Sequence, residues 1–81
     1  MSTITVRYFA GARAAAGVES ESRAAATLQE LHAQLADAHG ERLGRVLAAC
    51  SFLVDGAAAH DRGARLSPGA VVDVLPPFAG G

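Results

Sequence analysis

The chain has 81 residues, of which 51% are hydrophobic and 19% charged, and its formal net charge is −1 at pH 7. A chain of this length holds one domain with a small core, and this composition is typical of a folded globular protein rather than a disordered one. Its seven strongly basic residues are all arginines, scattered from Arg7 to Arg65 rather than grouped in a phosphate-binding stripe. We therefore expect that the chain does not bind nucleic acid.

Cysteine usage and the N-terminal segment indicate the cellular compartment. Cys50 has no second cysteine with which to form an internal disulfide, and no basic segment followed by an apolar signal core stands at the N-terminus. No apolar stretch approaches the roughly 20 residues that span a bilayer. Together these features predict a cytoplasmic protein.

The first part of the chain predicts two strands. Residues 3–9 alternate polar and apolar side chains and are rich in β-branched and aromatic types, as in a half-buried strand. Its core-facing residues are Ile4, Val6 and Tyr8. This alternation turns Phe9 toward the opposite face of the strand, away from the core. A loop from Gly11 to Gly17 is expected next, and residues 18–25 are expected to return as a second strand.

Two helices are predicted in the middle of the chain. Thr27 and Glu30 have the spacing of a capping box, in which each side chain satisfies a backbone N–H at a helix start. One apolar stripe follows at helical spacing: Leu28, Leu31, Leu35 and Ala38. Gly40 is expected to end this helix. A second, short amphipathic helix is indicated by Leu43, Val46, Leu47 and Cys50.

Three more strands are predicted after the helices. Residues 51–54 form a strand candidate, and Asp55-Gly56 is a strong signal for a two-residue hairpin turn. Its partner strand is expected within residues 57–60. Residues 71–75 are a further strand, which ends at Pro76-Pro77 because proline has no backbone N–H to donate. This order of elements predicts an α+β domain whose helices cover one face of a mixed sheet.

The last six residues have the sequence Pro-Pro-Phe-Ala-Gly-Gly. We expect the domain to span residues 1–75 and residues 76–81 to form an extended tail, which reaches at most about 20 Å beyond the sheet. Phe78 is a candidate anchor for this tail. Gly80 and Gly81 have no side chains, so they can thread a narrow tunnel.

Three segments carry a resemblance to a known family: Val6 to Arg13, Phe52 to Gly56, and Asp73 to Gly81. On these segments the chain resembles the MoaD/ThiS sulfur carriers, most closely those that serve as the small subunit of molybdopterin synthase. The strand followed by Pro-Pro, an aromatic residue, a small residue and Gly-Gly is the most specific of the three. The resemblance implies a ubiquitin-like β-grasp fold with a flexible C-terminal Gly-Gly tail.

The resemblance also implies a function carried out with partner enzymes. An ATP-dependent activating enzyme would adenylate the carboxylate of Gly81, with Gly80 as its required neighbour. A sulfur donor system would convert it to a thiocarboxylate. The large synthase subunit would then use that sulfur to build the dithiolene of molybdopterin. The chain itself is expected to bind no cofactor and to act as a non-catalytic carrier, while the ATP is used by the activating enzyme.

Residue chemistry agrees with this cycle. A free α-carboxylate has a pKa near 3.5, so at neutral pH it is an anion that reacts poorly until it is coupled to AMP. Glycine places no Cβ near the carbonyl that is attacked. If the first and last strands lie side by side, as the resemblance implies, four apolar residues would form a docking patch for the large subunit: Phe9, Val71, Leu75 and Phe78.

Other candidate sites are interpreted as structural. Cys50 lies on an apolar stripe and is expected to be buried. The histidines, at 32, 39 and 60, lack metal-site spacing and are expected on the solvated surface. Gly11 and Gly17 lack the lysine and the serine or threonine of a phosphate-binding loop.

Three alternatives to the molybdopterin carrier remain open. These are a carrier for thiazole or cysteine biosynthesis, a ubiquitin-like protein modifier, and a plain binding module with an idle tail.

Overall fold

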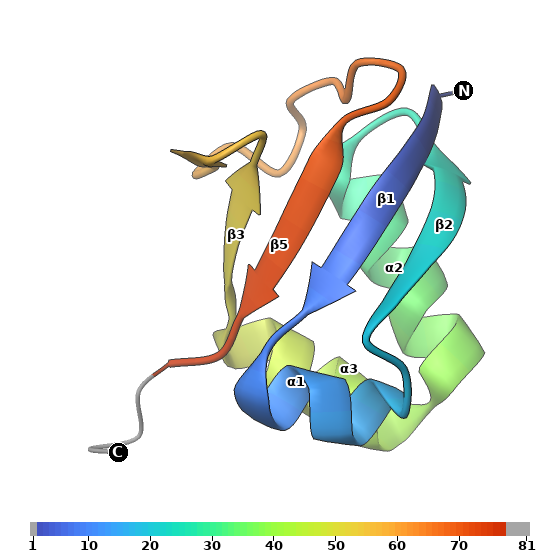
Figure 1. Cartoon of the computed structure of the whole chain (residues 1–81), viewed down its shortest axis with the longest axis vertical. Coiled ribbons are helices and arrows are strands. Elements are labelled where there is room, and N and C mark those ends of the chain that lie inside the picture. The colour runs from blue at the N-terminus through green and yellow to red at the C-terminus, as the bar shows by residue number, and fades with distance from the viewer. Residues whose placement is uncertain (1, 78–81) are drawn as a thin grey trace.

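The computed structural model describes residues 2–77, so Met1 and residues 78–81 lie outside the described part of the chain. Its elements, in chain order, are β1 (Ser2–Tyr8), α1 (Ala10–Ala16), β2 (Ser20–Ala25), α2 (Leu28–His39), α3 (Glu41–Ala49), β3 (Ser51–Val54), β4 (Ala57–Ala58) and β5 (Val71–Leu75). Figure 1 shows the strands in one twisted sheet. The predicted α+β class is confirmed.

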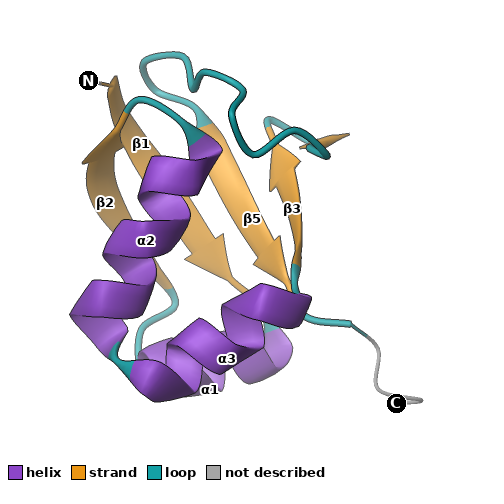
Figure 2. Ribbon diagram, turned by 180° about the vertical axis from the view of Figure 1, so that it is seen from behind, coloured by secondary structure: helices purple, strands orange, loops and turns teal. Residues whose placement is uncertain are grey.

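The sheet has the strand order β2-β1-β5-β3-β4. β5 runs parallel to β1 and antiparallel to β3, and the two outer pairs, β1–β2 and β3–β4, are antiparallel. The first and last strands therefore lie side by side at the centre, as the family resemblance implied. Figure 2 shows α2 and α3 over one face of the sheet, with α1 at the end where β1 and β5 finish.

The core lies between this face and the helices. β1 contributes the predicted set, Ile4, Val6 and Tyr8, each at most 1% exposed. The helices contribute Leu28, Leu31, Leu35, Leu43 and Leu47, and the later strands contribute Phe52, Val72 and Val74. Ala38, predicted for the stripe of the first helix, is exposed instead. His39 is half-buried in its place, because the buried stripe continues four residues after Leu35 rather than three.

The expected loop between Gly11 and Gly17 is wrong, since most of this segment is the helix α1. Alanine has the highest helix propensity of any residue, and five of the seven residues of α1 are alanines. Gly17 ends the helix with a left-handed φ of 78°, and its N–H donates to the Arg13 carbonyl at 2.9 Å. Ala12 is the one residue of this helix that is fully buried. The segment therefore has almost no apolar stripe from which a helix could be predicted.

The predicted turn and cap chemistry is confirmed. Glu30 N–H donates to Thr27 Oγ1 at 3.1 Å, and the Glu30 carboxylate accepts from the Ala26 N–H at 3.4 Å, so the cap reaches back one residue further than expected. Asp55 and Gly56 both have positive φ, 50° and 85°, as a tight hairpin turn between β3 and β4 requires. Within residues 2–77, no helix is long and apolar enough to cross a lipid bilayer.

Candidate functional site

The tail begins at the end of the central strand. β5 pairs with β1 on one side and with β3 on the other, and Leu75, its last residue, is in register with Ser51. Figure 1 shows the chain leaving the sheet directly after β5, toward Pro76 and Pro77. The predicted site residues Phe78, Gly80 and Gly81 lie outside the described residues.

The outer face of the sheet, the one that α2 and α3 leave uncovered, carries the other predicted docking residues. Val72 and Val74 point into the core, so the alternation of the strand turns Val71 and Leu75 outward, where both are half-buried. Phe9 follows the end of β1, and its N–H donates to the Val74 carbonyl at 3.2 Å. Its side chain is 40% exposed. The structure thus brings Phe9, Val71 and Leu75 to one face.

An ion pair that the sequence did not predict lies within this group. Arg7 and Asp73 are register partners on β1 and β5. Arg7 Nε donates to Asp73 Oδ1 at 2.6 Å and Nη2 donates to Oδ2 at 2.9 Å. The hydrogen bond and the charge of Asp73 raise the pKa of Arg7. The Asp73 side chain is 10% exposed and that of Arg7 is 52% exposed, so only the arginine presents a large surface.

Leu53 on β3 completes the face on the other side of β5. It is the register partner of Asp73 and is half-buried. We call the set Phe9, Leu53, Val71 and Leu75, with the Arg7–Asp73 pair among them, the outer patch. Alternation along residues 51–54 could have identified Leu53, because its neighbour Phe52 is the larger core residue.

A polar cluster lies at the opposite, helix-covered side of the sheet. The Tyr8 hydroxyl donates to Glu21 Oε2 at 2.7 Å, and Arg23 Nε donates to Glu21 Oε1 at 2.7 Å. His39 Nε2 also contacts Oε2, and the His39 and Tyr8 rings meet edge to face with centroids 5.9 Å apart. The prediction that His39 is a solvated surface residue is therefore wrong: it helps to close the core above β2.

His32 is also half-buried, contrary to the prediction. Its Nδ1 accepts a hydrogen bond from the Arg62 guanidinium, whose Cζ lies 4.8 Å from the centroid of the Phe52 ring. Burial, followed by the positive charge of Arg62, lowers the pKa of His32. His60 is exposed, as predicted. Among the described residues, no three His, Cys, Asp or Glu side chains come together as metal ligands.

Cys50 is buried, as predicted. Its Sγ lies 3.0 Å from the Val46 carbonyl, to which it donates, and burial raises the pKa of the thiol. A thiol with a raised pKa supplies little thiolate at neutral pH, so this position does not favour a nucleophile or a persulfide carrier.

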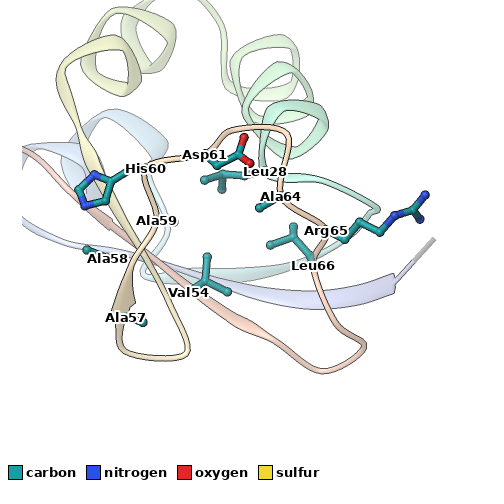
Figure 3. Close-up of a pocket in the computed structure, with 10 residues that line it drawn as sticks. All are labelled: Leu28, Val54, Ala57, Ala58, Ala59, His60, Asp61, Ala64, Arg65 and Leu66. Carbon is teal, nitrogen blue, oxygen red and sulfur yellow. The ribbon is translucent and has the colours of Figure 1, made fainter.

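A hollow of about 280 Å³ lies under the β3–β4 hairpin. Figure 3 shows Val54 and Leu66 projecting toward it, below Leu28. Its remaining lining is mostly alanine, with His60, Asp61 and Arg65 around it. Because β3 begins beside Leu75 and ends at this hairpin, the hollow lies at the far end of the sheet from Pro76. It is poorly placed to serve the tail.

Comparisons with known proteins show which family and which solved structures this chain resembles. The sequence model of the ThiS family matches residues 6–81. No curated protein matches the sequence. Among solved structures, the putative molybdopterin converting factor subunit 1 of Pyrococcus furiosus is 26% identical with a TM-score of 0.85, and the match covers 96% of this chain and 100% of that one.

Two further structures extend the likeness. The complex of subunits 1 and 2 of molybdopterin-converting factor from Helicobacter pylori contains a chain that is 28% identical with a TM-score of 0.76, over 98% of this chain and 99% of that one. Small archaeal modifier protein 1 from Methanosarcina acetivorans has a TM-score of 0.88 over 100% and 98% of the two chains, but at 20% identity it shows the fold alone. The predicted ubiquitin-like β-grasp fold is confirmed.

Proposed function

The chain belongs to the ThiS family, and on this basis we propose that it is a sulfur carrier for molybdopterin biosynthesis whose reacting residue is Gly81. The observation that carries the proposal is the course of β5, which is held at the centre of the sheet and leads directly into Pro-Pro-Phe-Ala-Gly-Gly. Two relatives above 25% identity favour this pathway: the putative molybdopterin converting factor subunit 1 of P. furiosus, and a chain of the H. pylori complex of subunits 1 and 2 of that factor.

Three steps complete the proposed cycle, and partner enzymes in the cytoplasm catalyse them. A carboxylate oxygen of Gly81 attacks the α-phosphorus of ATP, and pyrophosphate leaves. Hydrosulfide (HS⁻) supplied by the donor system then attacks the carbonyl carbon, AMP leaves with the electrons of the broken C–O bond, and loss of the S–H proton gives a thiocarboxylate. On the large synthase subunit the thiocarboxylate sulfur bonds to a carbon of the pterin precursor and displaces an oxygen substituent from it; water then cleaves the resulting thioester, which leaves the sulfur on the precursor and restores the Gly81 carboxylate. Gly80 and Gly81 offer no Cβ to block any attack.

The outer patch supports docking to that large subunit. Val71 and Leu75 lie on β5, which leads to the tail, and Phe9 directly follows the end of the neighbouring β1, so a partner that covers them also lies next to Pro76 and Pro77. Phe78 would extend the contact along the tail. In H. pylori the related chain was solved in complex with subunit 2, as this proposal requires of our chain.

Intact-protein mass spectrometry tests the carrier function. The chain is incubated with ATP, a sulfide source and the activating enzyme of its source organism. We expect a mass gain equal to the replacement of one oxygen by sulfur, located at Gly81 by fragmentation. A variant without Gly80 and Gly81 and a reaction without ATP are the matched controls, and both should keep their original mass. An unchanged mass of the full chain in the complete reaction would overturn the proposal.

A second measurement separates the pathways. The thiocarboxylated chain is mixed with the large synthase subunit and the pterin precursor, and formation of molybdopterin is followed. Thiazole or cysteine carriers would show the same mass gain but no molybdopterin. A protein modifier would instead be found joined through Gly81 to lysines of other proteins. The modifier structures from Haloferax volcanii and M. acetivorans are 24% and 20% identical to this chain, so they show only the shared fold and do not support a modifier function for it.

A further inference from the structure

The Arg7–Asp73 pair occupies the middle of the outer patch, between apolar residues on three neighbouring strands or their ends. Thr5 and Val71 form the next register pair toward one end of the sheet, and Phe9 and Leu75 follow toward the tail. Leu53 lies beyond Asp73 on β3. Any partner that covers the apolar residues must also cover the guanidinium of Arg7.

We propose that the partner surface which docks on the outer patch carries a carboxylate side chain that pairs with the free edge of the Arg7 guanidinium. This inference rests on the proposed function, because the partner is the large subunit that receives the tail. It assigns the chemistry of the partner surface at one position: an acidic residue surrounded by apolar ones.

The hydrogen-bond inventory of Arg7 leads to this conclusion. A guanidinium has five N–H donors in a planar fork. Asp73 takes one from Nε and one from Nη2, so three remain, two of them on Nη1. In the free protein water can satisfy these three, since the Arg7 side chain is 52% exposed. Docking removes that water, and an arginine donor that is buried without an acceptor is strongly unfavourable.

Asp73 holds the guanidinium in place for such a contact. Both of its carboxylate oxygens are engaged by Arg7, and its side chain is only 10% exposed, so the pair presents the partner with the arginine edge and not with the acid. The Arg7 Cζ also lies 5.9 Å from the centroid of the Phe9 ring. The free edge is therefore fixed beside the aromatic ring of the patch, and a planar carboxylate fits it with two parallel hydrogen bonds.

The chemistry of the guanidinium favours an acid over a neutral acceptor. A hollow of about 190 Å³ beside Phe9 is lined by Arg7 and Arg13 and also by Glu19. Arg13 Nη1 lies 3.9 Å from Glu19 Oε1, too far for a hydrogen bond, and the Glu19 side chain is 82% exposed to water. The charges of this region balance, since Asp73 and Glu19 stand against the two arginines, so the preference for an acid comes from the guanidinium itself, which pairs more strongly and bidentately with a carboxylate than with a neutral acceptor.

Replacing the pair by apolar residues tests the proposal. The double variant Arg7→Leu/Asp73→Leu removes both charges together, so no buried carboxylate is left alone in the fold. Its affinity for the large subunit is measured by titration calorimetry with the full chain. We expect it to bind about 30-fold more weakly or worse than the unmodified chain, because the partner's carboxylate becomes buried without a counter-charge.

The matched control removes another ion pair from the opposite side of the molecule. Arg45 Nη2 and Glu41 Oε1 are 2.6 Å apart on α3, and both side chains are more than three-quarters exposed. Glu41→Leu/Arg45→Leu should therefore bind within about twofold of the unmodified chain, because surface pairs of this kind contribute little. Circular dichroism confirms that each variant is folded.

The outcomes separate this inference from the proposed function. If the unmodified chain binds the large subunit and the Arg7→Leu/Asp73→Leu variant binds equally well or more tightly, the partner presents no carboxylate and the inference is overturned. If the unmodified chain does not bind, the synthase assignment itself fails. Should the double variant not fold, Arg7→Lys keeps a charge next to Asp73 but loses the planar fork. It should bind about tenfold more weakly, and unchanged affinity would again overturn the inference.

Discussion

Replacing Tyr8 by phenylalanine should lower the free energy of unfolding by about 2 kcal/mol at pH 7. The buried ring is kept, so the change removes only the hydroxyl that donates to Glu21 Oε2 at 2.7 Å. A hydrogen bond to a charged group contributes about 1.5–3 kcal/mol, and Glu21 retains Arg23 and His39, which favours the lower half of that range. In a domain of this size, this loss corresponds to a decrease in Tm of about 8–16 °C.

Urea unfolding, followed by far-ultraviolet circular dichroism, measures this loss at pH 7 and at acid pH. Burial tends to raise the pKa of Glu21, but the hydrogen bonds from Tyr8, His39 and Arg23 more than offset it and hold the pKa below its usual value. The stability that depends on the Glu21 charge is therefore present above the usual glutamate pKa of about 4.3 and is lost as the pH falls through the lowered value. The difference in the free energy of unfolding between the unmodified chain and the Tyr8→Phe variant should therefore become smaller below about pH 4.

A Glu21→Gln background provides the control. In that background the acceptor is neutral, so Tyr8→Phe should lower the free energy of unfolding by only about 0.5–1.5 kcal/mol, and this loss should no longer change as the pH falls into the acid range. A loss smaller than about 0.5 kcal/mol in the unmodified background, or a loss that stays constant through acid pH, would refute the view that Tyr8 donates to a charged, partly buried carboxylate.

Four further predictions concern other parts of the chain. Phe9→Ala should change the free energy of unfolding by less than about 1 kcal/mol while it weakens binding of the large subunit about tenfold; unfolding of the variant would instead place the ring in the core. Thr27→Ala removes the cap of α2 and should lower stability by about 1 kcal/mol in urea unfolding. Because burial and Arg62 lower the pKa of His32, stability should decline as the pH falls below about 6.5, and His32→Gln should flatten this decline in thermal melts. The buried Cys50 thiol should react with a thiol reagent only as fast as the domain unfolds, so immediate labelling would contradict its buried position.

The sequence alone was sufficient to predict an element where its two faces differ strongly in polarity, or where a cap or turn sequence marks its end. β1 alternates between core and solvent, so its buried set was predicted residue by residue. The start of α2 was predicted from Thr27 and Glu30, and the β3–β4 turn was predicted from Asp55-Gly56. In each case a local pattern, either polar–apolar alternation or a cap or turn sequence, specified the structure without knowledge of the rest of the fold.

Helix α1 could not be found by the same rules. Its alanines have high helix propensity but side chains too small to make an apolar stripe, and glycines at positions 11 and 17 suggested a loop. The helix is stabilised by its place in the fold, where Ala12 packs into the core at the end of the sheet. The helix propensity of the alanines was the available sequence signal for this helix, and the two glycines argued against it.

Charged contacts of the site were missed because they depend on strand register. Arg7 and Asp73 are 66 residues apart and meet only because β1 and β5 are parallel with this alignment. A shift of one residue would turn Asp73 into the core. His39 was misplaced for a similar reason, since the step from Leu35 to the next buried position can be three or four residues in a helix. Periodicity identifies faces, whereas these contacts need the alignment of neighbouring elements.

The position of β5 connects the docking surface to the chemistry of the tail. A strand paired on both sides is held by two hydrogen-bonded ladders, so a partner that pulls on residues 76–81 must break both before it displaces Leu75. Val71 and Leu75 lie on this same strand, and docking on them therefore fixes the start of the tail relative to the partner. Six extended residues reach at most about 20 Å, so the reactive centre of each partner must lie within that distance of Leu75. The activating enzyme and the synthase can thus take the same Gly81 in turn, provided that each places its active site at this distance from a surface that fits the outer patch.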